Sequence, residues 1–345
     1  MELGIYTFGD LVPDPATGKP MITLKQRMDE VLALARLADE AGLDVFGLGE
    51  HHHPEYVVLA TATVLAAAAA VTKRIRLSSA STLLSTADPV RTFEEFATVD
   101  LISGGRAEII AGRGAFIEGF ALFGYDLNDY DALFAEKLGL LMALNTSERV
   151  TWSGKFRPAL HDAVVMPRPF QERLPLWIGA LSPQSVVRAA SLGLPLTLPF
   201  LGGSLPGYAQ TAALYREAWQ AAGYNPNNAR VAVFSHMHVA ETSQAARSEF
   251  LPAYAAYMNQ MMLRHRGQRV PRAAIEQMAS LQGTLLIGSP EEVVERLLHQ
   301  HELLGNVRYV GQIDVGGQSF AQAAKGIELL ATKVAPAVRK ALAPL

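Results

Sequence analysis

Cysteine is absent from the 345-residue sequence, which excludes disulfide bonds, thiolate metal sites and cysteine-ligated iron–sulfur clusters. A strong charge of either sign is also missing: the formal net charge is -3 and lysine and arginine are scattered, so we expect no nucleic-acid partner. No apolar run reaches the roughly 20 residues of a membrane-spanning helix. The longest run, at residues 57–71, is rich in alanine and predicts a buried helix. Because the N-terminus has the pattern of a strand and lacks the basic start of a secretory signal, we expect a cytoplasmic protein with no membrane partner.

Strand and helix patterns alternate along the chain without a linker rich in Gly, Ser or Pro, which predicts a single domain over residues 1–345. Eight strands are expected, at residues 2–8, 44–48, 75–81, 106–110, 175–178, 194–198, 230–238 and 308–313. Helices are expected between them, for example at residues 24–41, 89–102, 130–144, 183–192, 206–222 and 290–304. This alternation predicts an α/β fold of the (β/α)8 TIM-barrel type, with insertions after the fourth and seventh strands at residues 150–169 and 250–283. A doubly wound sheet would need a glycine-rich phosphate loop after the first strand, and residues 9–15 do not provide one.

One acid and three consecutive histidines follow the second expected strand: Glu50, His51, His52 and His53. The carboxyl ends of barrel strands face the mouth where active sites form, so these side chains are candidates for catalysis. Imidazoles there could bind a metal ion, or they could donate hydrogen bonds and act as general acids. Neighbours on an extended segment point to alternate sides, and the HExxH spacing is absent. We therefore expect no metal site, although a metal-dependent hydrolase that also used histidines of the seventh strand is an alternative.

An arginine between two glycines follows the fourth expected strand, in the sequence Gly112-Arg113-Gly114. Glycines let the backbone approach a ligand closely, and the guanidinium group can bind an anion through two hydrogen bonds. The motif therefore indicates a phosphate site. In the structural alternative, Arg113 caps the carboxyl end of a helix or pairs with Glu118.

Two serines mark the start of the helix expected after the fifth strand, in a segment that runs from Gly179 and Ala180 to Ser185. Ser182 occupies the N-cap position and Ser185 the first turn, so hydroxyl groups and free N–H groups meet at the positive end of a helix. Anions bind at such positions. Ordinary helix capping is the alternative explanation for the same residues.

Two weaker features are compatible with either a ligand cavity or plain packing. Ala80-Ser81-Thr82, at the end of the third strand, has small side chains that could lie against a flat ring or allow tight packing in the barrel. Residues 254–262 carry aromatic and methionine side chains at helical spacing, which is more often typical of a core than of a substrate cavity.

In their order along the chain, these motifs resemble those of the bacterial luciferase-like flavin-dependent monooxygenases. The resemblance extends over nearly the whole chain and rests on residues 50–52, 84–91, 103–106, 112–114, 182–185 and 287–293. It implies a TIM-barrel flavoprotein that uses reduced FMN and dioxygen to oxidise a small organic substrate. It further implies that a separate NAD(P)H-dependent flavin reductase supplies the reduced FMN, and that the chain forms a homodimer or a higher homo-oligomer.

The resemblance also implies roles for individual residues. His51 matches the histidine that assists the oxygen chemistry, and Glu50 and His52 would line or orient its site. Arg113, Ser182 and Ser185 would hold the FMN phosphate, and Ala80 and Ser81, often joined by a cis peptide in this family, would lie against the isoalloxazine ring. The small residues around these positions complete the expected cofactor site: Gly112, Gly179 and Ala180.

The sequence also departs from the luciferases. Leu181 stands where the luciferase α subunit has an acid beside the phosphate-binding hydroxyl groups, and His53 adds a third imidazole. We therefore do not expect light emission or a long-chain aldehyde substrate. Use of the deazaflavin F420 and flavin binding without turnover are the alternatives to an FMN-dependent enzyme.

Overall fold

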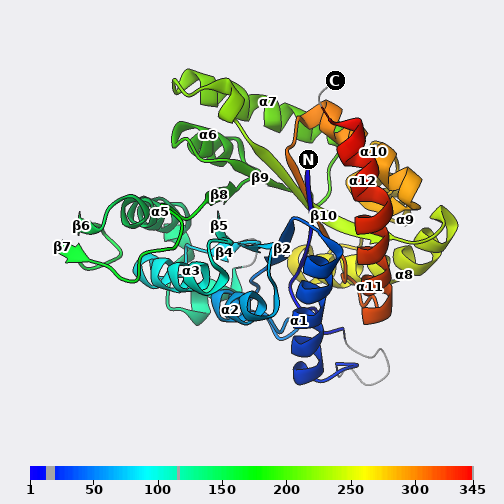
Figure 1. Cartoon of the computed structure of the whole chain (residues 1–345), viewed down its shortest axis with the longest axis horizontal. Helices are drawn as coiled ribbons and strands as arrows, with labels where there is room; N and C mark the ends of the chain where they lie inside the picture. The colour runs from blue at the N-terminus through cyan, green and yellow to red at the C-terminus, as the bar shows by residue number, and fades with distance from the viewer. Residues whose placement is uncertain (13–19, 115–116, 344–345) are drawn as a thin grey trace.

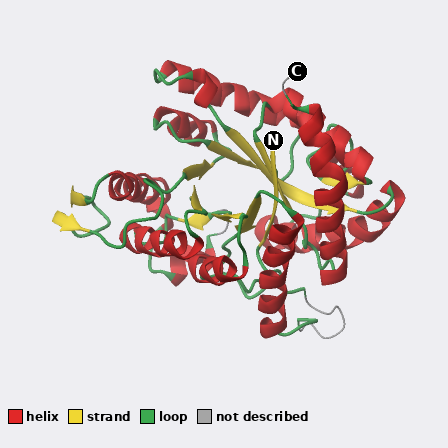
Figure 2. Cartoon of the chain, in the orientation of Figure 1, coloured by secondary structure: helices red, strands yellow, loops and turns green. Residues whose placement is uncertain are grey.

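Eight parallel strands form a closed barrel in the computed structural model, which describes residues 1–12, 20–114 and 117–343. Each strand pairs with the next, and the last pairs with the first, in the order β1 (Glu2–Thr7), β2 (Val45–Leu48), β3 (Arg76–Ser79), β5 (Ala107–Gly112), β8 (Leu176–Gly179), β9 (Leu196–Pro199), β10 (Val231–Val239) and β12 (Arg308–Gln312). Figures 1 and 2 show the strands at the centre of the molecule and the helices around them. The predicted TIM barrel is confirmed, and each predicted strand is found with ends within two residues of those observed.

Helices follow the strands on the outside of the barrel. They are α1 (Leu24–Ala41), α2 (Thr61–Val71), α3 (Pro89–Ser103), α4 (Glu118–Leu122), α5 (Tyr130–Thr146), α6 (Pro183–Ser191), α7 (Leu205–Ala221), α10 (Pro290–Leu304), α11 (Phe320–Leu329) and α12 (Ala335–Ala341). The alanine-rich stretch forms the largely buried helix α2, as predicted. Over the described ranges, every helix is too short or too polar to cross a membrane.

Both predicted insertions are present. The first is an antiparallel hairpin of β6 (Arg149–Trp152) and β7 (Leu160–Val164), which projects from the barrel at the left of Figure 1. The second follows β10 and consists of the long helix α8 (Ser243–Arg266) and the short helix α9 (Arg272–Met278). Two short strands extend the sheet at its margins, β4 (Thr82–Leu83) beside β5 and β11 (Leu286–Gly288) beside β10.

Local sequence signals set the helix ends. Thr23 forms a capping box with Gln26 at the start of α1, and Gly42 ends that helix in the left-handed conformation. Asp88 caps α3 through its side chain, and Pro89 occupies the first helical position, where its missing N–H is not needed. These caps hold the helices at fixed places against the barrel, so that the loops above the strands start from rigid supports.

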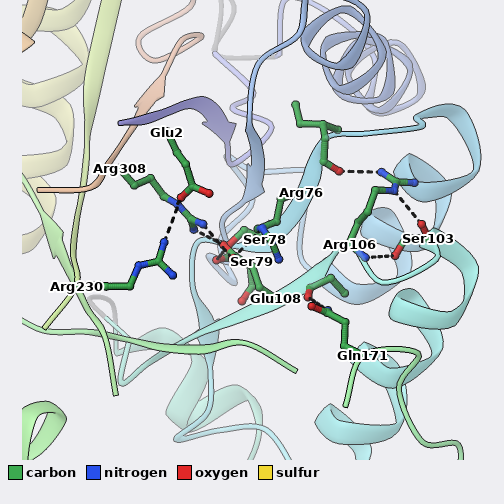
Figure 3. A network of polar contacts seen from close by, with 12 residues as sticks. Glu2, Arg76, Ser78, Ser79, Ser103, Arg106, Glu108, Gln171, Arg230 and Arg308 are labelled. Carbon is green, nitrogen blue, oxygen red and sulfur yellow. Dashed lines mark hydrogen bonds and ion pairs between the residues drawn. The ribbon is translucent and has the colours of Figure 1, made fainter. Parts of the chain in front are cut away.

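A buried ion pair crosses the base of the barrel (Figure 3). Arg308 on β12 contacts Glu108 on β5, at an Nη1–Oε1 distance of 2.5 Å, and both side chains are almost fully buried. Arg308 also donates from Nε to Glu2 Oε2 at 2.7 Å, and its guanidinium lies 4.7 Å from the ring centroid of Trp177. In the order of the barrel, β5 and β12 are on opposite sides, so this pair joins opposite walls. The ion pair and its aromatic neighbour therefore close the amino-terminal end of the barrel, opposite the carboxyl ends of the strands.

We expect Glu108→Gln to lower the free energy of unfolding by about 3 kcal/mol, because it leaves a buried guanidinium with reduced compensation. Urea denaturation followed by circular dichroism measures this change. Asp162→Asn, which alters the fully exposed pair of Arg149 and Asp162 in the hairpin, is the matched control and should leave the midpoint unchanged. Equal midpoints for the two variants would show that the basal pair does not stabilise the barrel.

Candidate functional site

A cavity of about 590 Å³ opens among the carboxyl ends of the barrel strands. Its size is within the range of small-molecule and cofactor sites. Most of the residues predicted from the sequence line it together: Glu50, His51, Ala80, Ser81, Gly112, Arg113, Gly179, Ala180 and Ser182. His52 and Ser185 are not part of the lining and instead lie behind residues that are. Segments far apart in the sequence thus converge on one cavity.

The corner of the cavity where the sequence predicts a phosphate, the phosphate corner, is built from the end of β5 and the start of α6. Ser182 caps α6, and Arg113 Nη2 lies 3.4 Å from its hydroxyl oxygen. Ser182 in turn donates to Ser185 Oγ at 2.8 Å, so the buried Ser185 holds the orientation of the cap. The guanidinium of Arg113, the hydroxyl of Ser182 and the start of a helix therefore lie together, and this combination is chemically suited to a phosphate.

Arg113 has two further neighbours on α5. It forms an ion pair with Asp131, whose side chain is 68% exposed, and its guanidinium lies 5.0 Å from the ring centroid of Tyr130. The sequence-based alternative of a pair with Glu118 is not what the structure shows. Because Asp131 is largely exposed and its pair is screened by water, it can release Arg113 to a better anion at small cost.

The end of β3 forms a bulge at the cavity wall. The peptide between Ala80 and Ser81 is cis, and the Ala80 N–H donates to Leu48 O at 2.7 Å. A Cβ atom at Gly112 would lie 2.2 Å from Ser81 Oγ, so a side chain at this position would require Ser81 to move. Gly112 therefore serves packing against Ser81 as well as backbone approach to a ligand. The two predicted cofactor segments depend on each other.

The residues of the acid–histidine motif have different places: Glu50 and His51 line the cavity, and His52 lies behind Glu50. His51 lines the cavity and stacks on Phe8, with ring centroids 4.1 Å apart. Glu50 accepts from the Leu83 N–H at 3.1 Å through one oxygen, and its other oxygen lies 2.7 Å from His52 Nε2. His52 packs edge-on against Phe123 outside the lining. Glu50 thus links the end of β2 to β4, the short strand after the Ala80–Ser81 bulge, and His52 orients Glu50.

His53 points away from this arrangement. Its Nδ1 lies 3.7 Å from Glu55 Oε2, beside a separate small hollow. The three imidazoles therefore do not converge on one point, because the chain turns here and the His53 N–H donates to His51 O at 2.8 Å. Across the described ranges, no group of three or more His, Asp or Glu side chains is arranged to hold a metal ion.

The cavity is also lined by Tyr6, His236 and Gln312, which the sequence did not assign to the flavin site. They lie on adjacent strands at one level, since Gln312 is in register with Tyr6 on β1 and with His236 on β10. His236 Nδ1 lies 3.0 Å from the Tyr254 hydroxyl, and burial lowers its pKa to about 4, so the ring is neutral. A polar residue within a buried strand was the available signal for His236 and Gln312, and no such signal in the sequence marked Tyr6.

Helix α8 supplies the outer wall of the cavity. Tyr257, Met258, Met261 and Met262 line it, whereas Tyr254 faces a buried cluster with Phe250. For the aromatic and methionine side chains of residues 254–262 the sequence allowed either core packing or a cavity wall. In the structure some of them line the cavity and others pack in the core. Arg264 and Gln260 of this helix bind Glu55 in the loop that carries the histidines, at 2.5 and 2.8 Å. This contact joins the second insertion to the site.

Comparison with known proteins agrees with this geometry. The sequence model of the family described as luciferase-like monooxygenase matches residues 1–306. The oxygenase component of the flavin-dependent trigonelline monooxygenase of Acinetobacter baylyi is 26% identical, over 91% of both chains. The alkanal monooxygenase alpha chain of Photorhabdus luminescens is 30% identical, over 61% of this chain and 58% of the relative.

Solved structures show the same fold. The crystal structure of the monooxygenase RslO1 from Streptomyces bottropensis superposes with a TM-score of 0.83 and 27% identity, over 97% of this chain and 99% of that one. An F420-dependent secondary alcohol dehydrogenase shares the fold at 16% identity, with a TM-score of 0.76 over 98% of this chain and 99% of that one. The extent of the family match, over a barrel whose strand ends carry the expected motifs, shows that the chain belongs to the luciferase-like monooxygenase family.

Proposed function

We propose that this protein is an FMN-dependent monooxygenase that uses reduced FMN and dioxygen to oxidise a small organic substrate. The observation that carries the proposal is the donor set of Arg113, Ser182 and the start of α6 at one corner of the cavity. This set suits a phosphate monoester, which riboflavin lacks and FMN has. The flavin-dependent relative supports a flavin as the cofactor.

The remainder of the cavity fits a flat ring attached to such a phosphate. Ala80 and Ser81 present small side chains, and Gly112 and Gly179 leave the wall between the ring position and the phosphate corner open. When bound, reduced FMN would supply the electrons that activate dioxygen. The residues of the chain would hold its phosphate, orient its ring and exclude water from the reacting edge.

His51 is the residue that we assign to proton transfer. Its ring lines the cavity on the same side as the Ala80–Ser81 bulge, since β2 and β3 are neighbours in the barrel. Stacking on Phe8 fixes the plane of the imidazole, so a ring nitrogen can meet the reacting oxygen without a large loss of side-chain entropy. We assign Glu50 and His52 to positioning, because Glu50 accepts from the Leu83 N–H on β4, just after the bulge, and His52 bonds Glu50.

Further parts of the proposal concern the assembly. The relative from Acinetobacter baylyi is an oxygenase component, which supports a separate NAD(P)H-dependent flavin reductase as the source of reduced FMN. We also propose that residues 1–345 act as one domain, within a homodimer or a higher homo-oligomer. Analytical ultracentrifugation with and without FMN tests the oligomeric state.

We expect Arg113→Ala to weaken FMN binding by about 1.5 to 3 kcal/mol, because it removes a charge-assisted contact to the phosphate. Riboflavin binding should change much less. Fluorescence titration of both flavins measures the difference, and titration of F420 in parallel tests the deazaflavin alternative. Asp131→Ala is the control, because it removes the exposed partner of Arg113 and should not weaken the binding of FMN. Equal weakening of FMN and riboflavin by Arg113→Ala would contradict the phosphate assignment.

We expect His51→Ala to keep the FMN affinity within a few-fold and to lower substrate oxidation by about 10² to 10⁴, the usual range for a lost general acid or base. Reduced FMN should still be consumed by dioxygen, with hydrogen peroxide formed in place of product. The measurement is the yield of product and of peroxide per reduced FMN, with a compound that the unaltered protein oxidises. An unchanged product yield would make His51 a packing residue.

Treatment with a chelator should leave both FMN affinity and turnover unchanged, because the histidines after β2 point in different directions. Metal analysis of the purified protein and assays before and after dialysis against a chelator test this. Loss of turnover on metal removal, with recovery on adding zinc or iron, would instead support a metal-dependent hydrolase.

A further inference from the structure

The deep wall of the cavity, opposite the phosphate corner, carries two polar groups that the proposed FMN contacts do not use. They are the hydroxyl of Tyr6 on β1 and the imidazole of His236 on β10. In the order of the barrel, β1 and β10 flank β12, which lies directly across from β5, and β5 and β8 supply the phosphate corner. Both side chains line the cavity, and in the described part of the chain neither the Tyr6 hydroxyl nor His236 Nε2 has a hydrogen-bond partner.

Strand register places these groups below the ring position. Tyr6 is in register with Gly47 on β2, and Gly47 with Ser78 on β3. Gln312 links Tyr6 to His236 at the same level. Ala80 and Ser81 come after Ser78 along β3, so they lie nearer the mouth of the barrel. A molecule that reaches Tyr6 and His236 must therefore extend deeper than the bulge.

The tautomer of His236 follows from its partner. Tyr254 is fully buried, and His236 Nδ1 is the one hydrogen-bond partner that the described residues give to its hydroxyl. A buried phenol must donate its hydrogen to avoid an unsatisfied group, so Tyr254 donates to Nδ1. The ring hydrogen of neutral His236 is then on Nε2, which is a donor available to a ligand.

Both groups are uncharged. Burial lowers the pKa of His236 to about 4 and raises the pKa of Tyr6 well above its ordinary value, so neither ionises near neutral pH. Behind this wall, burial and nearby Asp314 raise the pKa of Asp10, which accepts from Gln312 Nε2 at 3.1 Å. Arg113, at the far side, is the one guanidinium or ammonium group among the described lining residues. An anion at the deep wall would thus be buried without a counter-charge, which is costly.

The remaining lining of the cavity is largely apolar. It includes Met258, Met261 and Met262 of α8, which forms the outer wall, and Pro199 and Leu201 at the end of β9. Methionine side chains adapt to ligands of varied shape, so this wall favours a hydrophobic body without dictating its outline.

We propose that Tyr6 and His236 form a substrate-anchoring subsite that binds the uncharged carbonyl or hydroxyl oxygen of a largely apolar molecule and discriminates against carboxylates. The proposal rests on the proposed function, of which it names the substrate class. The Tyr6 O–H and the His236 N–H come from β1 and β10, the two strands that flank β12, and together they would fix the position of one oxygen below the flavin ring. Tyr6 and His236 are specificity-determining residues, because they contact the substrate but transfer no proton in this assignment.

Direct binding of matched probes tests the subsite without flavin. The probes are 2-naphthol and naphthalene, which share an apolar body and differ by one hydroxyl group, and binding is followed by naphthyl fluorescence. The unaltered protein should prefer 2-naphthol. Tyr6→Phe removes only the phenolic oxygen and should reduce this preference about fivefold, the value of one net hydrogen bond. Tyr215→Phe, which removes a hydroxyl bonded to Leu194 O on outer helix α7, is the control and should leave the preference intact.

Two substitutions of His236 separate its donor from its support of Tyr254. His236→Asn retains an acceptor for the Tyr254 hydroxyl but has no donor at the position of Nε2. It should reduce the 2-naphthol preference about fivefold. His236→Gln extends an amide N–H to the position of Nε2 and should restore it. A third probe, 2-naphthoate, is measured in the Arg113→Ala background so that this arginine cannot bind it, and it should bind at least tenfold more weakly than 2-naphthol.

Three results would overturn the subsite: no preference for 2-naphthol, binding of neither probe, or an equal loss in Tyr215→Phe. FMN titration of Tyr6→Phe and His236→Asn completes the test, and the affinity should stay within a few-fold of the unaltered protein. A tenfold loss of FMN affinity in both would transfer the pair to the pyrimidine edge of the flavin and refute a substrate role. If FMN fails to bind the unaltered protein while the 2-naphthol preference holds, the cofactor assignment is wrong and the subsite stands.

Discussion

The buried contact between Glu108 and Arg308 is the constraint on which the arrangement of the barrel depends. It joins β5 to β12 across the interior, at the end of the barrel opposite the site. A buried charge that has lost its partner is strongly destabilising, whereas an apolar pair at the same positions is not. The two strands must therefore keep the register that brings Glu108 and Arg308 together. Because Glu2 and Trp177 also contact Arg308, the same point fixes β1 and β8.

Because the strand register is fixed at this end of the barrel, it also determines which side chains lie together at the other end. Side chains alternate along a strand, so a shift of one residue would turn every cavity residue of that strand towards the helices. With register set, Tyr6, Gln312 and His236 share one level, and the Ala80–Ser81 bulge lies above it beside Gly112. The positions of the polar groups are therefore consequences of barrel packing, and no loop has to fold around a ligand to create them.

The sequence predicts the barrel well because its signals are local. Alternating strand and helix periods, proline and serine at helix starts and glycine at helix ends each act within a few residues. The motifs at the ends of β2, β5 and β8 could be recognised for the same reason, and the barrel order brings them together. Sequence could not assign Asp131 as the partner of Arg113, since that contact depends on how α5 packs beside the end of β5. Local pattern alone could not show that His51 lines the cavity and His52 lies behind it, because this depends on the path of the chain after Leu48, and only the family resemblance distinguished their roles.

Tyr6 and His236 show the limit most clearly, because their significance depends on three strands that are distant in sequence. A tyrosine in a first strand is ordinary, and a histidine in a seventh strand is most simply a satisfied core residue. Only the closed barrel places both beside a cavity and opposite Arg113. The result is a cavity with a cation at one wall and neutral donors at the other. An elongated molecule with an anionic end and an uncharged end could bind in one direction only. The same difference in charge would direct the phosphate of a cofactor to the wall with Arg113 and a neutral substrate to the opposite wall.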